Sequence, residues 1–209
     1  NTSDKMPFRT IDKRKEAKAV RMIQIDAAGP SGILSAALSP LESIYSATVR
    51  KKISSLQGME KVSLPAKVIS IGNITLGGTG KTPVCIYLAK RFSQAGRKVG
   101  ISTRGYGRKS GAPTVITKNT NIATWKECGD EPLLFAASPH ITAIAIERDK
   151  ALGAALLVRD HSCDTVILDD GFQFVTLKRD YDIVLLDAAA PFGNGRLLPR
   201  GTLREPLSA

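Results

Sequence analysis

Aromatic residues and cysteines are scarce in this chain of 209 residues: aromatics make up 5% of it, and there are three cysteines. Cys85, Cys128 and Cys163 are odd in number and widely spaced, which indicates neither a disulfide framework nor a Cys-x-x-Cys metal site and fits a reducing compartment. The longest uncharged stretch, residues 27–41, is interrupted by glycine and proline, whereas spanning a bilayer takes about 20 apolar residues. We therefore expect no transmembrane helix.

Positive charge is abundant by contrast, since 30 Lys and Arg residues face 19 Asp and Glu residues for a formal net charge of +11. This excess suits an anionic partner such as a nucleic acid, a nucleotide or an acidic membrane surface. Nucleic acid is the weakest of the three, because aromatics are few and no RNA- or DNA-binding motif accompanies the charge. With 43% hydrophobic residues, the chain can form a core in one generous domain or two small ones.

The N-terminal part differs from the rest. Residues 1–26 carry eleven charges with little periodicity and are predicted to form a mobile or weakly helical arm. Apolar residues then recur at helical spacing, and a basic end follows. They are Leu34, Leu38, Leu41, Tyr45 and Val49, followed by Arg50, Lys51 and Lys52. Two interpretations stay open: an anchor lying on an anionic bilayer, or a helix that packs its stripe on the domain.

From residue 66 short apolar runs alternate with helical stretches, which is typical of βαβ units on a mostly parallel sheet. We expect strands near 67–72, 98–103, 141–146, 165–169 and 182–187, and helices near 83–95, 130–138 and 148–160. The predicted fold class is α/β, a P-loop NTPase-like sheet flanked by helices and preceded by the amphipathic helix. Residues 1–58 would form the arm and membrane-surface helix, and residues 59–209 the nucleotide-binding domain.

A glycine-rich segment joins the first predicted strand to its helix: Thr75-Leu76-Gly77-Gly78-Thr79-Gly80-Lys81-Thr82. A strand that ends in glycines turns successive N–H groups into one concavity, and the helix adds its positive end, so a phosphate-binding loop belongs here. Lys81 would reach the β- and γ-phosphates, and Thr82 would offer its hydroxyl to Mg²⁺. The match to G-x-x-x-x-G-K-[ST] fails at its first position, where Thr75 replaces glycine. The alternative is a glycine-rich turn before an ordinary helix.

A second candidate feature is an apolar strand, residues 166–168, that ends in Asp169 and Asp170. In an open α/β sheet, ligands collect outside the carboxyl ends of the strands, so this pair should lie beside the phosphate loop. One carboxylate can hold Mg²⁺ while its neighbour points elsewhere or orients a nucleophile. Taken alone, the pair also fits an ordinary turn.

Three polar, glycine-rich segments adjoin predicted strands and could reach the same edge: residues 103–107, 129–132 and 191–199. Asp130 stands where a helix begins, which favours its ionised form and a role as proton acceptor; the alternative is a helix N-cap. Arg104 could clamp a phosphate with its planar fork, or could simply cover surface.

These segments together resemble one known family. Residues 72–83, 104–106, 129–132, 169–173, 191–199 and 203–207 occur in the order found in tetraacyldisaccharide 4′-kinases, and the resemblance runs from about Leu38 to the last residue. It implies a P-loop kinase at the cytoplasmic face of a Gram-negative inner membrane, which uses ATP and Mg²⁺ to phosphorylate the 4′-hydroxyl of a lipid A disaccharide precursor.

The resemblance also implies residue roles. Lys81 and Thr82 would serve the phosphates and Mg²⁺, and Asp130 would be the catalytic base, with Lys81 and Arg104 as further catalytic candidates. The metal region would comprise Thr82, Asp169, Asp170 and Glu205.

The sequence departs from the family pattern at three points. Phe174 follows Gln173 where relatives commonly have His, and Thr103 replaces a Ser before the Arg-Gly-Tyr, which puts one polar contact in question. The chain also ends at Ala209, where the family normally continues through a second α/β half. We therefore expect a C-terminally truncated chain that could hold the nucleotide site and lack turnover.

Other functions fit less well. A partition-type, membrane-binding ATPase switch would have a second lysine where Leu76 stands. A guanine-nucleotide switch would need Asn-Lys-x-Asp, which the segment 117–120 does not supply. An inactive nucleotide-binding fragment stays open, and the oligomeric state is left undetermined.

Overall fold

The computed structural model describes residues 30, 32–56, 58–105, 112–120 and 128–207. The predicted arm of residues 1–26 lies outside this range, as do Tyr106 and Gly107. Within the described part, no helix is long and apolar enough to cross a membrane. The elements are α2 (Gly32–Ala37), α3 (Ser39–Leu56), β1 (Lys67–Asn73), α4 (Lys81–Gln94), β2 (Val99–Thr103), β3 (Thr114–Thr117), α6 (Asp130–Ala136), β4 (Ala143–Ile146), α7 (Lys150–His161), β5 (Thr165–Asp169) and β6 (Tyr181–Leu185).

One six-stranded sheet organises the chain, in the order β3-β4-β2-β5-β1-β6. Every pair of neighbours is parallel except β3 and β4, which are antiparallel. The predicted α/β class and mostly parallel sheet are therefore confirmed. The edge strand β3 was not predicted, because four residues with one buried side chain make no long apolar run.

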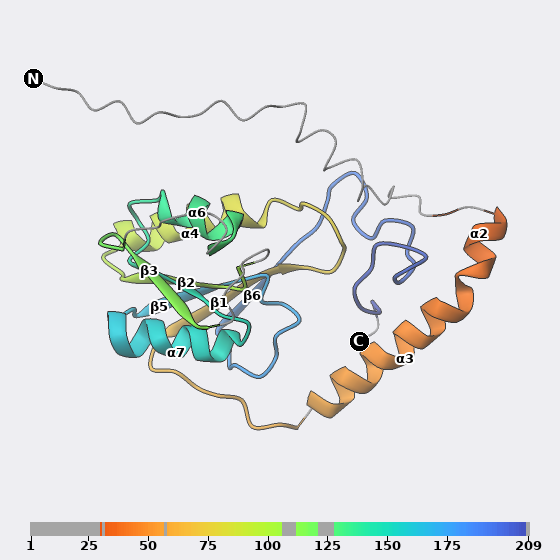
Figure 1. Ribbon diagram of the computed structural model, residues 1–209, viewed down its shortest axis with the longest axis horizontal. Coiled ribbons are helices and arrows are strands. Elements are labelled where there is room, and N and C mark those ends of the chain that lie inside the picture. The colour runs from red at the N-terminus through yellow and green to blue at the C-terminus, as the bar shows by residue number, and fades with distance from the viewer. Residues whose placement is uncertain (1–29, 31, 57, 106–111, 121–127, 208–209) are drawn as a thin grey trace, which may run out of the picture.

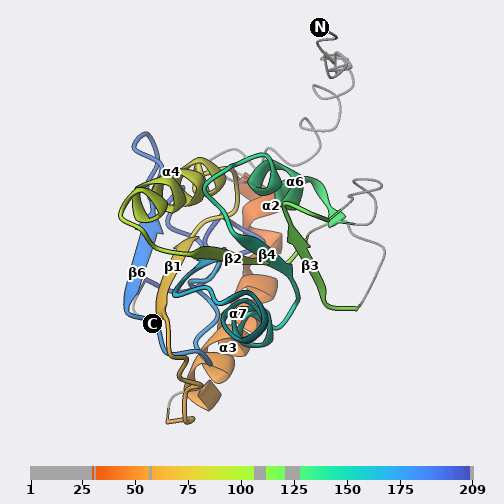
Figure 2. The same cartoon turned by 90° about the vertical axis from the view of Figure 1, so that its left-hand side faces the viewer.

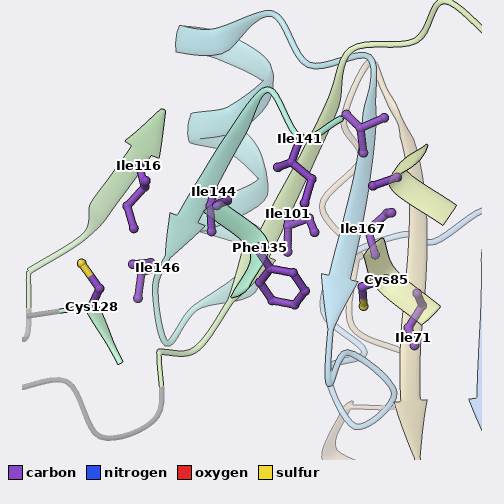
Figure 3. Close-up of a cluster of buried hydrophobic side chains, with 12 residues drawn as sticks. Ile71, Cys85, Ile101, Ile116, Cys128, Phe135, Ile141, Ile144, Ile146 and Ile167 are labelled. Atoms are coloured by element: carbon purple, nitrogen blue, oxygen red, sulfur yellow. The ribbon is translucent and has the colours of Figure 1, made fainter. Parts of the chain in front are cut away.

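Helices cover both faces of the sheet. Figures 1 and 2 show α4 and α6 on one face and α7 on the other. The four central strands, β1, β2, β4 and β5, are buried on both faces, and their side chains alternate between two cores. In β4, Ile144 and Ile146 join the α4–α6 core, whereas Ala143 and Ala145 join the α7 core. Figure 3 shows Phe135 of α6 among the isoleucines of the first core.

The N-terminal helices lie apart from these layers, beside the last described loop (Figure 1). The expected single helix is interrupted between α2 and α3, where Pro40 has no N–H to bond the carbonyl of residue 36. The predicted stripe also divides between two faces: Leu38, Tyr45 and Val49 are half-buried, while Leu34 and Leu41 are exposed. Both faces of this helical segment are therefore partly apolar.

Candidate functional site

Polar residues gather at the carboxyl edge of the sheet, because neighbouring parallel strands end there together. Ile71 of β1 pairs with Asp169 at the end of β5, and Ser102 of β2 pairs with Leu168. Asn73, Thr103 and Asp169 therefore end three adjacent strands, as expected for the ligand side of an open α/β sheet.

The glycine-rich loop has the backbone that its sequence predicts. Gly77 and Gly80 adopt φ of 122° and 79°, which residues with a Cβ rarely adopt. Gly80 is the N-cap of α4 and offers no side-chain acceptor to the first N–H groups of that helix. No side-chain cap occupies these donors, which is the arrangement expected of an anion site at a helix N-terminus.

The non-glycine start of the loop has a structural reason. Thr75 is buried and forms an antiparallel bridge with Leu203, and the N–H of Leu76 donates to the carbonyl of Thr202 at 2.7 Å. Thr75 thus continues extended backbone, where a β-branched residue is suitable and glycine is not needed.

Lys81 stands at the centre of the site. Its side chain is 13% exposed, and its Nζ donates to Asn73 Oδ1 at 3.1 Å and lies 3.7 Å from Asp170 Oδ1. Asn73 in turn donates its Nδ2 to the carbonyl of Thr75 at 2.6 Å. Asn73 was not predicted as a site residue, although a side-chain amide at the end of a buried strand could have indicated it.

The loop also contains a shielded hydroxyl. Thr79 Oγ1 is buried and has no hydrogen-bond partner among the described residues. A buried hydroxyl without a partner is unusual and destabilising, so this position suits a ligand that supplies an acceptor or donor.

The two predicted carboxylates occupy different environments. Asp169 is 2% exposed, and its Oδ2 accepts a hydrogen bond from Thr103 Oγ1 at 2.8 Å. Burial raises the pKa of Asp169, while the charge of Lys150 opposes this rise. The hydroxyl of Thr103 therefore supplies a polar contact at the position where the family has Ser.

Asp170 points elsewhere because its φ of 50° lies in the left-handed region, which Asp tolerates better than most residues. Its carboxylate is 40% exposed, and both oxygens accept from Arg204, at 2.9 and 3.0 Å. The carboxylate of Asp170 therefore has two cationic neighbours, the guanidinium of Arg204 and the ammonium of Lys81. Arg204 was not predicted as a site residue.

Lys150 is a buried lysine next to Asp169. It is 5% exposed at the start of α7, and its Nζ donates to the backbone carbonyl of Asp169. Burial lowers its pKa, while the charges of Asp169 and Asp170 act in the opposite direction. No sequence motif indicated this residue, since a lysine at a helix start is ordinarily solvent-exposed.

A glycine allows the loop after Asp170 to approach β1. A Cβ on Gly72 would lie 2.5 Å from the Cβ of Phe172, so only glycine fits. This approach lets Gln173 Nε2 donate to the carbonyl of Asn73 at 2.9 Å and to Glu205 Oε1 at 3.4 Å. Burial raises the pKa of Glu205. Phe174 packs against the α7 core.

The remaining candidates lie around this centre. Asp130 is the exposed first residue of α6, and Gly129 is the N-cap, so the alternative role of Asp130 as a cap is wrong. Its half-buried neighbour Glu131 has a pKa raised by burial and then by the charge of Asp169. Arg104 is exposed after β2, and its charge acts on Lys150. The catalytic roles of Asp130 and Arg104 stay predictions.

The donors suit Mg²⁺ that arrives with phosphates. Mg²⁺ prefers oxygen ligands and usually keeps several waters, with one or two carboxylates and substrate phosphates completing its shell. Of the predicted ligands, Thr82 carries a hydroxyl and Asp170 has a partly exposed carboxylate next to Lys81; their roles as metal ligands stay predictions. Across the described ranges, no three His, Cys, Asp or Glu side chains form a metal cluster, so a self-sufficient protein cage is not what the site offers.

A glycine-rich loop between β1 and α4, with a lysine beside the acidic end of β5, defines a P-loop nucleotide-binding protein. Comparisons with known proteins narrow this class. The chain belongs to the Tetraacyldisaccharide-1-P 4'-kinase family, whose model matches residues 34–209.

Individual relatives agree with this assignment. Tetraacyldisaccharide 4'-kinase of Halothermothrix orenii is 45% identical over 176 residues, which cover 82% of this chain and 46% of that protein. Its namesake from Chromobacterium violaceum is 41% identical over 192 residues, covering 90% and 55%. A crystal structure of LpxK from Aquifex aeolicus in complex with ATP matches with a TM-score of 0.74 and 36% identity, covering 84% of this chain and 56% of that one. The chain spans about half the length of the curated relatives it matches.

Proposed function

We propose that this chain carries the nucleotide site of a kinase that transfers the γ-phosphate of ATP to the 4′-hydroxyl of a tetraacyldisaccharide 1-phosphate, a lipid A precursor. The observation that carries the proposal is the position of Lys81, between Asn73 and Asp170 at the end of a P-loop. Family membership supplies the acceptor class, since the matched relatives are named for this reaction.

The residues divide the chemistry among them. The backbone donors of the loop and Lys81 bind the phosphates. Thr82 and Asp170 would hold the accompanying Mg²⁺, which would supply positive charge to the phosphate oxygens. The acceptor hydroxyl attacks the γ-phosphate in line while the bond between that phosphorus and the bridging oxygen breaks, so that ADP leaves, and Asp130 takes the proton of the hydroxyl. Arg104, exposed at the end of β2, provides a further cation for the phosphates.

The enzyme works at an anionic membrane surface, which we place at the cytoplasmic face of the inner membrane. Four large apolar side chains support this: Ile33, Leu34, Leu41 and Ile44 are 92%, 61%, 51% and 64% exposed. A helical segment with an apolar outer face and the basic residues 50–52 has the composition of an interfacial element. A lipid substrate that cannot leave the bilayer requires such an element.

The second candidate is an inactive nucleotide-binding fragment, which differs from the kinase in phosphate transfer and not in ATP binding. Phosphate transfer from ATP to tetraacyldisaccharide 1-phosphate in mixed micelles, measured beside ATP binding, separates the two. Phosphate transfer by the parent protein that is lost in Lys81→Ala supports the kinase function. ATP binding without transfer supports the fragment, and the absence of both overturns the assignment of a nucleotide site.

A further inference from the structure

A loop of residues 197–205 lies between α3 and the sheet (Figure 1). On its α3 side, Glu42 Oε2 forms an ion pair with Arg200 at 2.9 Å, and these side chains are only 14% and 16% exposed. Glu42 Oε1 also accepts the N–H of Leu197 at 3.0 Å. One carboxylate of α3 therefore holds the loop at two points.

Two further contacts join the helices to this loop. The hydroxyl of Tyr45 donates to the carbonyl of Arg204 at 2.9 Å. Arg200 donates to the hydroxyl of Ser35 at 3.1 Å and to that of Ser39 at 3.4 Å. The guanidinium of Arg200 thus reaches both α2 and α3, as its rigid fork of donors allows.

On the other side, the same loop is bound to the nucleotide site. The N–H of Arg204 donates to the carbonyl of Ile74 at 2.8 Å, and the carbonyl of Thr202 accepts from Leu76. The side chain of Arg204 then reaches both carboxylate oxygens of Asp170. Arg204 is therefore held by α3 through its carbonyl, by the residue before the phosphate loop through its N–H, and by Asp170 through its side chain.

Polar contacts have a large share in the position of α3, because its apolar side chains are at most half-buried. Neither α2 nor α3 contributes a fully buried residue. Without tight apolar packing, the position of the helix along the loop is set by directional bonds, and a shielded ion pair is a recognised way to specify such a register.

We propose that Glu42 and Arg200 are positioning residues for phosphate transfer: their ion pair fixes the 197–205 loop and thereby holds Arg204 against Asp170. The inference rests on the proposed function. It adds that α3, the helix with the exposed apolar side chains, helps to position Arg204 at the nucleotide site. Glu42 and Arg200 touch neither nucleotide nor acceptor in this account. Their effect should therefore appear in kcat and in the Mg²⁺ requirement rather than in acceptor KM.

Amide hydrogen exchange and steady-state kinetics on Glu42→Ala, Arg200→Ala and the double variant test the proposal. We expect exchange in residues 197–205 and 74–76 to accelerate and kcat to fall by about tenfold, the factor that a coupling of typical size produces. The double variant should be no worse than either single one. Glu42→Gln, which keeps an acceptor for Leu197, should be milder than Glu42→Ala. Ser43→Ala is the control, because this exposed hydroxyl bonds only within its own helix.

The readouts separate two failures. Amide hydrogen exchange can be measured on a protein that has no kinase activity. Absence of activity would refute the proposed function, and the exchange rates would still test the positioning role of Glu42 and Arg200. Faster exchange confined to α3, with the 197–205 and 74–76 segments as in the parent protein, would overturn the inference. Additive effects of the two substitutions, or accelerated exchange with unchanged kcat and Mg²⁺ requirement, would overturn it as well.

Discussion

Replacing Lys150 with Met tests whether the buried lysine stabilises the acidic end of β5. Methionine keeps most of the apolar stem but removes the ammonium that donates to the carbonyl of Asp169. At 5% exposure, water cannot replace the lost cation, and Asp169 at 2% exposure loses the charge that most opposes the effect of its burial. The substitution therefore leaves a buried carboxylate with less compensation.

The expected cost follows from this burial. Removing one partner of a buried charge pair typically destabilises a protein by about 3–5 kcal/mol. We expect the lower end, about 3 kcal/mol, because Asp169 keeps its hydrogen bond from Thr103. For a chain of this size, that loss lowers the melting temperature by roughly 6–12 °C. The double variant Lys150→Met with Asp169→Asn should recover part of the loss, because it removes both charges.

Urea denaturation followed by circular dichroism measures the effect as a lower midpoint with an unchanged slope. Lys67→Met is the matched control, because Lys67 also pairs with an aspartate but is 60% exposed. We expect the control to remain close to the parent protein, since exposed ion pairs contribute little. A Lys150→Met variant as stable as the control would refute the argument that Lys150 offsets the burial of Asp169.

Three further predictions concern the base, the membrane face and pH. Asp130→Asn should lower kcat by about 10²–10⁴-fold with little change in ATP affinity, and a loss confined to ATP binding would remove Asp130 from the role of base. The double variant Leu41→Ser/Ile44→Ser should co-sediment less with anionic vesicles. The control Tyr87→Ser, which removes an exposed aromatic from α4, should co-sediment like the parent protein, and equal binding by the parent and both variants would refute the membrane face. The raised pKa of Glu131 means that the folded state keeps this proton to higher pH than the unfolded chain, so its contribution to the free energy of unfolding falls as pH rises above 4.5. Glu131→Gln should make this decrease smaller in urea titrations from pH 4.5 to neutral pH, leaving the part that the raised pKa values of Asp169 and Glu205 contribute. An unaltered pH dependence would contradict the cause.

The parts of the site that could be predicted from sequence are local. Lys81 and Thr82 follow their glycines directly, and Asp169 ends an apolar run, so spacing along the chain was enough to identify them. Lys150 and Arg204 reach the same centre from distant segments, as donors to Asp169 and Asp170. Such contacts depend on how α7 and the last loop pack, which no periodicity encodes.

The N-terminal helix illustrates the same limit. Its apolar spacing predicted a helix, and a helix is present in two segments. The spacing did not predict which side chains would face the domain, because that depends on Glu42 and Arg200, a polar pair 158 positions apart. A search for apolar stripes passes over such a contact.

Calorimetric titration with ATP in the presence of Mg²⁺ measures directly whether the chain holds a nucleotide site. We expect one binding site per chain, loss of binding without Mg²⁺, and strongly weakened binding in Lys81→Ala. Lys90→Ala, which removes an exposed lysine from the same helix, should bind like the parent protein. Binding that Lys81→Ala leaves intact would contradict the assignment of residues 75–82 as the phosphate loop.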